Sequence, residues 1–274
     1  MKKIKEAFSK LWGIVTNPMV RILPGQIAFF LVLSIFPILI LVGLIASFFS
    51  ISMDTVVNAI NDALPLEVVN LMVPLLEGKG FDTNVGISMI TGFIIASNGA
   101  HSIILASNAL YGFPHSDLIK RRIKSIFIII LMIVLFVFTL LVLAFGDIIL
   151  KEILALISSD SVTNIIYQSF LYLRWPFAML IMFINIKLIY TMAPDWKIYS
   201  RYTTKGAAFT TIGWVLATMI YAYYASHFSN YDLFYGGLSN IVILMIWIYA
   251  LSYILVVGIA INVNEYQNED KENK

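Results

Sequence analysis

The sequence predicts an all-α, polytopic membrane protein with six transmembrane helices, short amphipathic helices at the membrane surface and both termini in the cytoplasm. Composition is the first observation: of 274 residues, 60% are hydrophobic, only 12% are charged, and the mean hydropathy is +0.88. A soluble chain of this length needs a much larger polar surface. Long charge-free stretches and an uneven distribution of basic residues are the other two observations. Together they predict a single integral-membrane domain over residues 1–274.

Residues 1–20 are predicted to form an amphipathic helix that lies on the anionic inner leaflet. Lysines occupy the polar faces of this helix, a pattern typical of interfacial helices. The stretch lacks the continuous apolar core and cleavage site of a signal peptide. A solvated helix that packs on the rest of the protein is the alternative. The apolar face holds Ile4, Phe8, Leu11, Trp12 and Val15.

Five stretches without a charged side chain are each long enough for a transmembrane helix, which needs about 20 apolar residues. A sixth candidate contains Arg174 and Lys187 but is otherwise apolar. Pro37 lies within the first stretch, where it is expected to kink the helix while neighbouring groups satisfy the carbonyl it frees. The predicted six-span bundle covers 26–263, with helices at 26–49, 86–112, 124–147, 170–192, 206–228 and 238–263.

The positions of the basic residues predict the orientation of the spans. If the N-terminus is cytoplasmic, most of the 18 lysines and arginines fall in cytoplasmic segments, and only Lys79 and Lys151 fall in external loops. The polar tail at 264–274 is then cytoplasmic as well. Two external loops, at 50–85 and 148–169, repeat apolar residues at helical spacing. They are predicted to form short helices at the outer interface.

Polar residues inside the predicted spans are the candidate binding residues, because a polar group in lipid turns toward a helix partner or a cavity. Four of them form one stripe on the second span, and two more share a face of the fourth span, eleven residues apart. The stripe either accepts a lipid head group or joins helices by hydrogen bonds. Arg174 either grips an anionic phosphate or extends to the outer interface. The candidates are Asn98, His101, Ser102, Asn108, Arg174 and Asn185.

Several classes of activity are disfavoured by the sequence. It contains no cysteine, so thiolate metal sites and cysteine nucleophiles are excluded. It has no HExxH, P-loop or GxSxG motif, and its predicted cytoplasmic acids are scattered, which disfavours a ribonuclease, a metalloenzyme and a self-contained ATP-driven pump. A net charge of +2 is too small to indicate nucleic-acid binding. The expectation is a non-enzymatic protein without cofactor or metal, with membrane lipids as partners and homo-oligomerisation left open.

Short motifs in a characteristic order extend along nearly the whole chain. They are Ala28-Phe29-Phe30 before Ser34-Ile35-Phe36-Pro37, the stretch ASNGAHSIILASNALYG from Ala96 to Gly112, Arg121-Arg122-Ile123-Lys124-Ser125, Tyr190 with Pro194, Lys205-Gly206-Ala207, Tyr235-Gly236, and Trp247-Ile248-Tyr249. In these motifs the chain resembles the YihY/BrkB family of bacterial inner-membrane proteins, some of which carry an old ribonuclease BN label. Ala260 departs from the pattern, since family members often have an acidic residue there. The resemblance implies a six-span protein of the bacterial cytoplasmic membrane.

Two functions fit these observations. The resemblance favours a transporter or flippase of an envelope lipid or amphiphile, since lipid transport has been proposed for some relatives. The polar stripe and the amphipathic segments at both surfaces favour the same function. A scaffold that recruits envelope enzymes without transporting anything is the alternative. A small-ion channel is less favoured, because no span carries a repeated ring of like charges.

Overall fold

The protein is all-helical over the residues that the computed structural model describes. These are residues 13–14, 16, 18–48, 54, 58, 85–114, 116–144, 150, 160–228 and 239–272, with side chains described over narrower ranges within the helices. No strand occurs in this part of the chain. The elements in chain order are α2 (Pro18–Phe48), α5 (Val85–Tyr111), α6 (Leu118–Ala144), α8 (Asp160–Met192), the 3-10 helix η1 (Ser200–Thr203), α9 (Thr204–Phe228) and α11 (Ser239–Glu272).

The all-α prediction is therefore confirmed, and each of the six predicted spans overlaps a long helix. Within the described residues, three stretches are long and apolar enough to cross a membrane: Ile166–Met192, Ser200–Tyr224 and Val242–Glu269. The apolar stretch in α2, Pro18–Ser34, is shorter. The count of six spans and their orientation stay predictions.

Four helices extend six to ten residues further than predicted. The predictions stopped where polar residues begin, but a charged side chain does not end a helix. Pro18 is pre-organised for a first turn, and the carbonyl of Asp117 accepts the Arg121 N–H as α6 begins. The helix α2 begins at Pro18 rather than 26, α6 at Leu118 rather than 124, and α8 at Asp160 rather than 170, while α11 continues to Glu272 instead of ending at 263.

Most of the predicted surface elements lie outside the described residues. This holds for the greater part of the amphipathic helix at 1–20 and for nearly all of the first external segment at 50–85. Both therefore stay predictions. Of the second external segment, at 148–169, residues 160–169 form the start of α8 instead of a separate interfacial helix.

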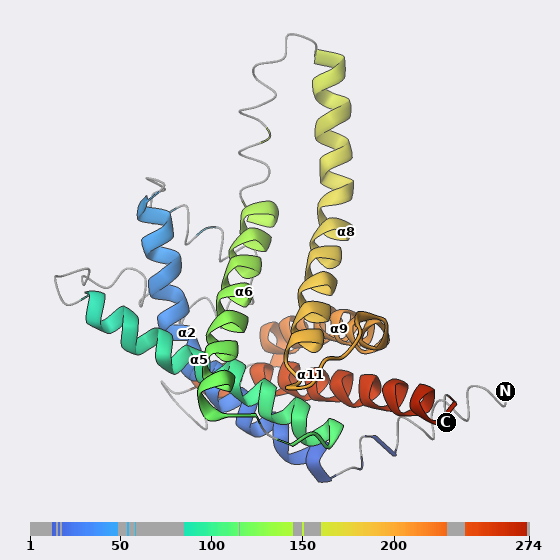
Figure 1. Ribbon diagram of the computed structural model, residues 1–274. Helices are drawn as coiled ribbons and strands as arrows, with labels where there is room; N and C mark the ends of the chain where they lie inside the picture. Colours follow the sequence, from blue (N-terminus) through green and yellow to red (C-terminus); the bar gives the residue numbers. More distant parts are fainter. Residues whose placement is uncertain are drawn as a thin grey trace.

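The long helices form a closed ring of neighbours. Each of α2, α5, α6, α8 and α9 packs on the next helix in this order, and α11 packs on both α9 and α2, which closes the ring. Figure 1 shows α6 and α8 upright beside each other, with the chain ascending in α6 and descending in α8, while α5 and α11 cross below them. The 3-10 helix η1 contacts α8, α9 and α11. Helices that follow each other in this order are thus also neighbours in space, as expected for a helical bundle.

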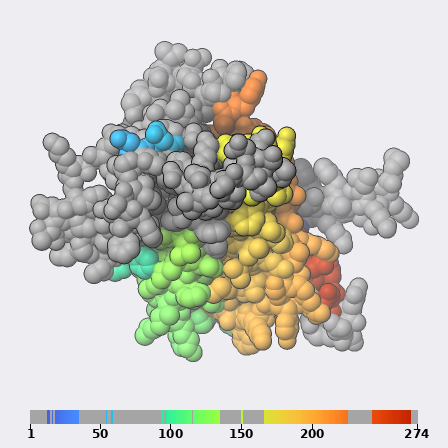
Figure 2. Space-filling model, turned by 90° about the horizontal axis from the view of Figure 1, so that it is seen from above, coloured from blue at the N-terminus to red at the C-terminus, as the bar shows by residue number. Residues whose placement is uncertain are grey.

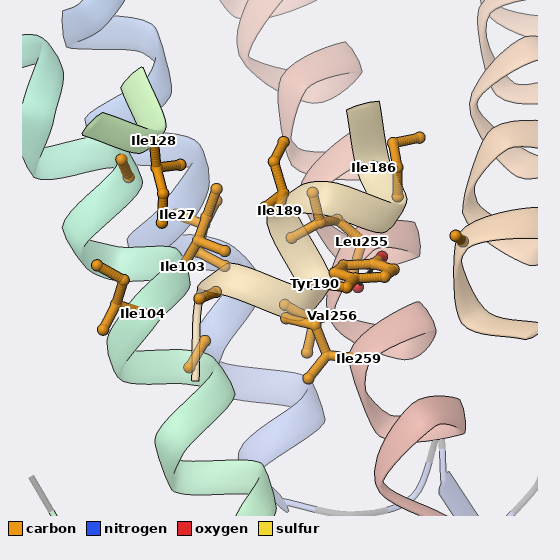
Figure 3. Close-up of a cluster of buried hydrophobic side chains, with 14 of the residues drawn as sticks. Ile27, Ile103, Ile104, Ile128, Ile186, Ile189, Tyr190, Leu255, Val256 and Ile259 are labelled. Carbon is orange, nitrogen blue, oxygen red and sulfur yellow. Dashed lines mark hydrogen bonds between the residues drawn. The ribbon is translucent and has the colours of Figure 1, made fainter. Parts of the chain in front are cut away.

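The core is an apolar cluster to which α2, α5, α6, α8 and α11 contribute (Figure 3). Tyr190 is its largest fully buried side chain. Its hydroxyl donates to the Leu255 carbonyl (2.8 Å) and shares a hydrogen bond with Thr210 Oγ1 (2.6 Å), so this polar tip is satisfied inside the core. The other labelled members are Ile27, Ile103, Ile104, Ile128, Ile186, Ile189, Val256 and Ile259.

Helices α9 and α11 approach each other through glycines. A Cβ atom on Gly206 would collide with the Gly258 carbonyl, and one on Gly258 would collide with the hydroxyls of Thr210 and Tyr190. The Gly206 N–H also donates to Asn262 Oδ1 (2.8 Å). Small residues that allow close backbone approach are typical of helix pairs in membranes.

The outer surface of the bundle is strongly apolar. Figure 2 shows α6, α8 and α9 side by side on one side of the molecule. An apolar surface of this extent is suited to lipid and not to water. Large exposed side chains on α8 alone are Tyr172, Leu173, Trp175, Phe177, Met179, Leu180, Ile184 and Leu188.

Candidate functional site

Polar and charged side chains gather where α5 ends, α6 begins and α8 leads into η1. We call this region, formed by the described residues of 108–124, 193–205 and 262–269, the polar end. Gly112 follows α5 with a φ of 72°, a left-handed conformation that glycine adopts without strain and that commonly ends a helix. Pro194 follows α8, where a proline disfavours continuation of the helix. These two breaks bring the loops after α5 and α8 together.

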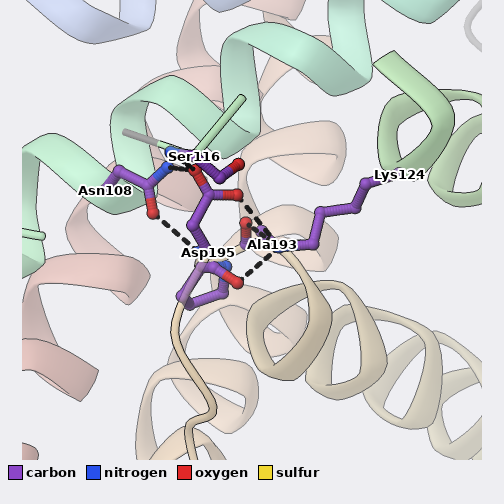
Figure 4. Close-up of polar contacts among 6 residues, drawn as sticks. Asn108, Ser116, Lys124, Ala193 and Asp195 are labelled. Carbon is purple, nitrogen blue, oxygen red and sulfur yellow. Dashed lines mark hydrogen bonds and ion pairs between the residues drawn. The ribbon is translucent and has the colours of Figure 1, made fainter. Parts of the chain in front are cut away.

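Asp195 is the centre of a hydrogen-bonded cluster in the polar end (Figure 4). Its Oδ2 accepts from Asn108 Nδ2 (2.7 Å) and the Ser116 N–H (3.0 Å), and its Oδ1 accepts from Lys124 Nζ (3.2 Å). The Asp195 N–H donates to Asn108 Oδ1 (2.8 Å). Lys124 Nζ also donates to the carbonyl of Pro194 (2.5 Å). Residues from α5, α6 and the segment after α8 are therefore joined by one carboxylate.

The Asp195 carboxyl is almost completely buried, with 3% of the side chain exposed. Burial on its own raises the pKa of a carboxyl group. The hydrogen bonds from Ser116 and from Lys124, together with the Lys124 charge, outweigh burial and hold the pKa of Asp195 below its ordinary value of 3.8. The group is therefore a carboxylate at neutral pH, which makes it a strong acceptor for its partners.

A second contact joins α6 to the middle of α5. Arg122 Nη1 donates to Asn98 Oδ1 (2.6 Å), and Nη2 donates to the Ile94 carbonyl (3.1 Å). Ser102, which is 2% exposed, donates to the Asn98 carbonyl (3.0 Å). Asn98 and Asn108 are ten residues apart on α5, about 15 Å at about 1.5 Å per residue. Polar groups therefore continue from the polar end well into the helix.

Arg121, the neighbour of Arg122, is 8% exposed. Within the described part of the chain, no hydrogen bond or ion pair is made by its side chain, and its buried Nε has no acceptor. A buried donor that is left without an acceptor is unfavourable, at about 1–3 kcal/mol. Arg121 is consequently an energetically unfavourable feature that packing alone does not explain.

The last helix completes the polar end. Tyr266 lies edge-on to Tyr111 (5.8 Å between ring centroids) and Tyr202 (5.6 Å). Glu265 Oε1 pairs with Lys205 Nζ (2.6 Å). The described part of the predicted polar tail thus continues α11 and packs on α5, η1 and α9, while its cytoplasmic location stays a prediction.

The six sequence-predicted residues fall into separate groups. Asn98, Ser102 and Asn108 make the contacts described above, and His101 is partly buried on the same helix. All four residues belong to α5, and the common binding face stays a prediction. Whether any of them binds a substrate stays a prediction.

Arg174 and Asn185 lie on α8, which packs mainly against α6, α9 and η1. The Arg174 guanidinium lies 6.0 Å from the Trp175 ring centroid. Asn185 Oδ1 is buried with no hydrogen-bond partner among the described residues. A substrate-binding role for these two residues also stays a prediction.

Sequence reasoning missed Asp195, Lys124, Arg121 and Arg122 as site residues. The basic residues were used only to predict orientation, and Asp195 was counted as one scattered acid. A signal was present, because all three basic residues belong to one of the family-like motifs, and Pro194 next to Asp195 belongs to another.

Two further points of the sequence analysis concern Ala260 and potential metal ligands. Ala260, where the family resemblance implies an acidic residue, is 8% exposed, so an alanine is well suited to this position. The described residues contain no group of three or more His, Cys, Asp or Glu suited to a metal ion, and the expected absence of a metal stays a prediction.

Comparison with known proteins decides the family. A family model described as virulence factor BrkB matches residues 20–274. The chain belongs to the virulence factor BrkB family. This membership agrees with the sequence motifs, and relatives named as membrane proteins identify this BrkB-family chain as a membrane protein.

Two relatives of the BrkB-family chain match over most of their length. The ribonuclease-like protein YfkH of Bacillus subtilis is 30% identical over 244 residues, which cover 87% of each chain. A UPF0761 membrane protein of Vibrio campbellii is 25% identical over 281 residues, covering 97% of this chain and 85% of the relative. A UPF0761 membrane protein of Idiomarina loihiensis is 29% identical over 109 residues, 39% of this chain and 38% of the relative. No solved structure matches the chain.

Proposed function

We propose that this BrkB-family protein is a multi-pass protein of the bacterial cytoplasmic membrane that moves an envelope lipid or another amphiphile between the leaflets. In this proposal the polar end faces the cytoplasm, because it carries the basic residues of α6 and η1. The protein acts as a transporter and not as an enzyme. Relatives named as membrane proteins support the membrane part of the proposal.

The observation that carries the proposal is the row of polar groups on α5. Asn108, Ser102 and Asn98 continue from the polar end into the helix, and Arg122 Nη1 lies 2.6 Å from Asn98 Oδ1. Around them the bundle is apolar and its surface is suited to acyl chains. A lipid in transit needs both environments at once, because its head group requires polar partners while its tails stay in the hydrocarbon.

Translocation in proteoliposomes tests this function. Purified protein is reconstituted with a fluorescent head-group-labelled phospholipid, and a membrane-impermeant reductant reports the fraction of label reaching the outer leaflet. The wild type is expected to accelerate exchange over empty vesicles. Arg122→Gln removes the cation beside Asn98 and is expected to slow exchange about tenfold or more, since a hydrogen bond to a charged group contributes about 1.5–3 kcal/mol.

Lys120→Gln is the matched control, because Lys120 lies two residues away with a side chain that is 76% exposed. It should exchange lipid at the wild-type rate. Both variants must reconstitute and melt like the wild type. Exchange no faster than in empty vesicles for the wild-type protein would contradict transport and favour the scaffold function instead.

A further inference from the structure

Arg121 occupies an unusual position in the charge distribution of the polar end. Its side chain is buried and, over the described residues, has neither an ion pair nor a hydrogen bond. The nearby carboxylates are already engaged: Asp117 pairs with Lys120 (3.5 Å) and Asp195 with Lys124 (3.2 Å). Each of these two carboxylates is thus paired with a lysine of α6, and neither is paired with Arg121 or Arg122.

The direction of the Arg121 side chain follows from its helix face. Arg121 lies one turn before Ser125 and two turns before Ile128, and both of these are 0% exposed. Residues at this spacing share a face, so Arg121 points into the bundle. Helical side chains lean toward the N-terminus, which directs the guanidinium toward the start of α6. The positive end of the helix dipole lies there and favours an anion.

The turn of α6 before Arg121 is exposed. Leu118 and Ile119, which begin α6, are 73% and 75% exposed. A phosphate group that approaches this turn from the surface of the bundle therefore lies close to the side that Arg121 Nη1 and Nη2 can reach. A guanidinium binds a phosphate bidentately through two parallel N–H donors, which a lysine cannot reproduce.

We infer that Arg121 is the centre of a binding site for a phosphate group, supplied either by a lipid head group or as free phosphate. The ligand provides the negative charge that the described residues do not give Arg121. This inference deepens the proposed function and rests on it for its biological role, because it assigns a phosphate-bearing head group to the transported amphiphile.

Binding to the full-length protein in detergent tests the site. The probes are dihexanoyl phosphatidic acid, inorganic phosphate, and dihexanoylglycerol, which has the same tails without the phosphate. Phosphatidic acid is expected to bind the wild type and raise its melting temperature, while dihexanoylglycerol has no effect. Arg121→Gln is expected to weaken phosphatidic acid binding about tenfold or more. Lys120→Gln, the exposed neighbour, should bind within about twofold of the wild type.

The unliganded proteins provide a second readout. If Arg121 serves a ligand, Arg121→Gln removes a largely buried arginine whose Nε has no acceptor, so without phosphate its melting temperature should equal or exceed that of the wild type. A structural role predicts the opposite. If Arg121→Gln does not fold, Arg121→Lys is the second test, because lysine keeps the charge but lacks the planar guanidinium. An Arg121→Lys variant that folds and binds phosphatidic acid less tightly supports the inference. Any other result for Arg121→Lys favours a structural role and overturns the inference.

The outcomes separate the two ligand sources and the two proposals. Binding of phosphatidic acid without inorganic phosphate identifies a lipid head group, and equal binding of both identifies free phosphate. Wild-type protein that binds neither, or an Arg121→Gln variant that binds both as tightly as the wild type, overturns the inference. Binding is measured in detergent and translocation in proteoliposomes, so the two proposals can fail separately. Protein that binds phosphatidic acid but does not translocate lipid refutes only the transport function. Protein that translocates lipid but does not bind phosphatidic acid or phosphate refutes only the phosphate site.

Discussion

In the polar end, hydrogen bonds from a few neighbouring groups replace the hydration that charged side chains lose on burial. Asp195 retains its charge because a lysine, an asparagine and a backbone N–H all donate to it. Arg122 instead finds neutral acceptors on α5. The donors and acceptors come from separate parts of the chain, so one carboxylate and one guanidinium hold α5, α6 and the end of α8 in register. The stability of the polar end therefore depends on a few residues.

Asp195→Asn tests this dependence. The substitution removes the charge that Lys124 pairs with and places an NH2 group among donors, so the variant should lose about 3 kcal/mol of unfolding free energy. Denaturant titration of the protein in detergent measures this loss. Asp117→Asn is the control, because the Asp117 side chain is 78% exposed and its surface pair contributes little. Equal stability of Asp195→Asn and the wild type would contradict the assignment.

The same carboxylate predicts an acid dependence of stability. The folded-state pKa of Asp195 is lowered from 3.8, so its contribution is fully present above the unfolded value and is lost as pH falls through the lower folded value. Melting temperatures measured from about pH 6 downward should show the wild type losing its advantage over Asp195→Asn below about pH 4. A constant difference between the two proteins across this range would argue against the shift.

Among the helix pairs, the contact between α9 and α11 depends on the absence of side chains. Gly206 and Gly258 let the two backbones approach, and the Tyr190 hydroxyl and Thr210 occupy the space beside Gly258. Close approach increases the van der Waals contact that drives helix association in lipid, where the hydrophobic effect between helices is absent.

Gly258→Ala is expected to separate these helices. The new methyl group would collide with the hydroxyls of Tyr190 and Thr210, at a cost of about 1–3 kcal/mol for overpacking. Thermal unfolding in detergent measures the effect. Gly25→Ala in α2 is the control, since nothing lies within 4 Å of its Cβ position, and alanine favours a helix over glycine. The prediction fails if the two variants melt at the same temperature.

The ring of helices as a whole places the charged residues of α6, η1 and α11 together at one end. Among the residues that the structure describes, the charged side chains thus gather at the polar end, while apolar side chains cover α6, α8 and α9. Such asymmetry fits a protein whose polar end lies at one membrane surface. The six crossings and their direction stay predictions.

Cysteine labelling tests this topology. The chain has no cysteine, so single replacements give an unambiguous signal. Lys120→Cys and Glu265→Cys should react with a membrane-impermeant maleimide only after the cytoplasmic side is opened, whereas Lys151→Cys should react in intact cells. Reaction of Lys120→Cys and Lys151→Cys from the same side would refute the predicted topology.

The residue pattern alone is enough to assign the all-helical class, the approximate place of each long helix and the family, because hydrophobicity is local and adds up residue by residue along a helix. The ends of the helices were predicted less well, since α6 and α11 continue through charged residues. The partners of the polar groups came only from the packed bundle. Asn108 and Asp195 are 87 residues apart, and the burial of Arg121 follows from its neighbours in space. Such pairings depend on how helices pack against each other, and no local pattern in the chain encodes them.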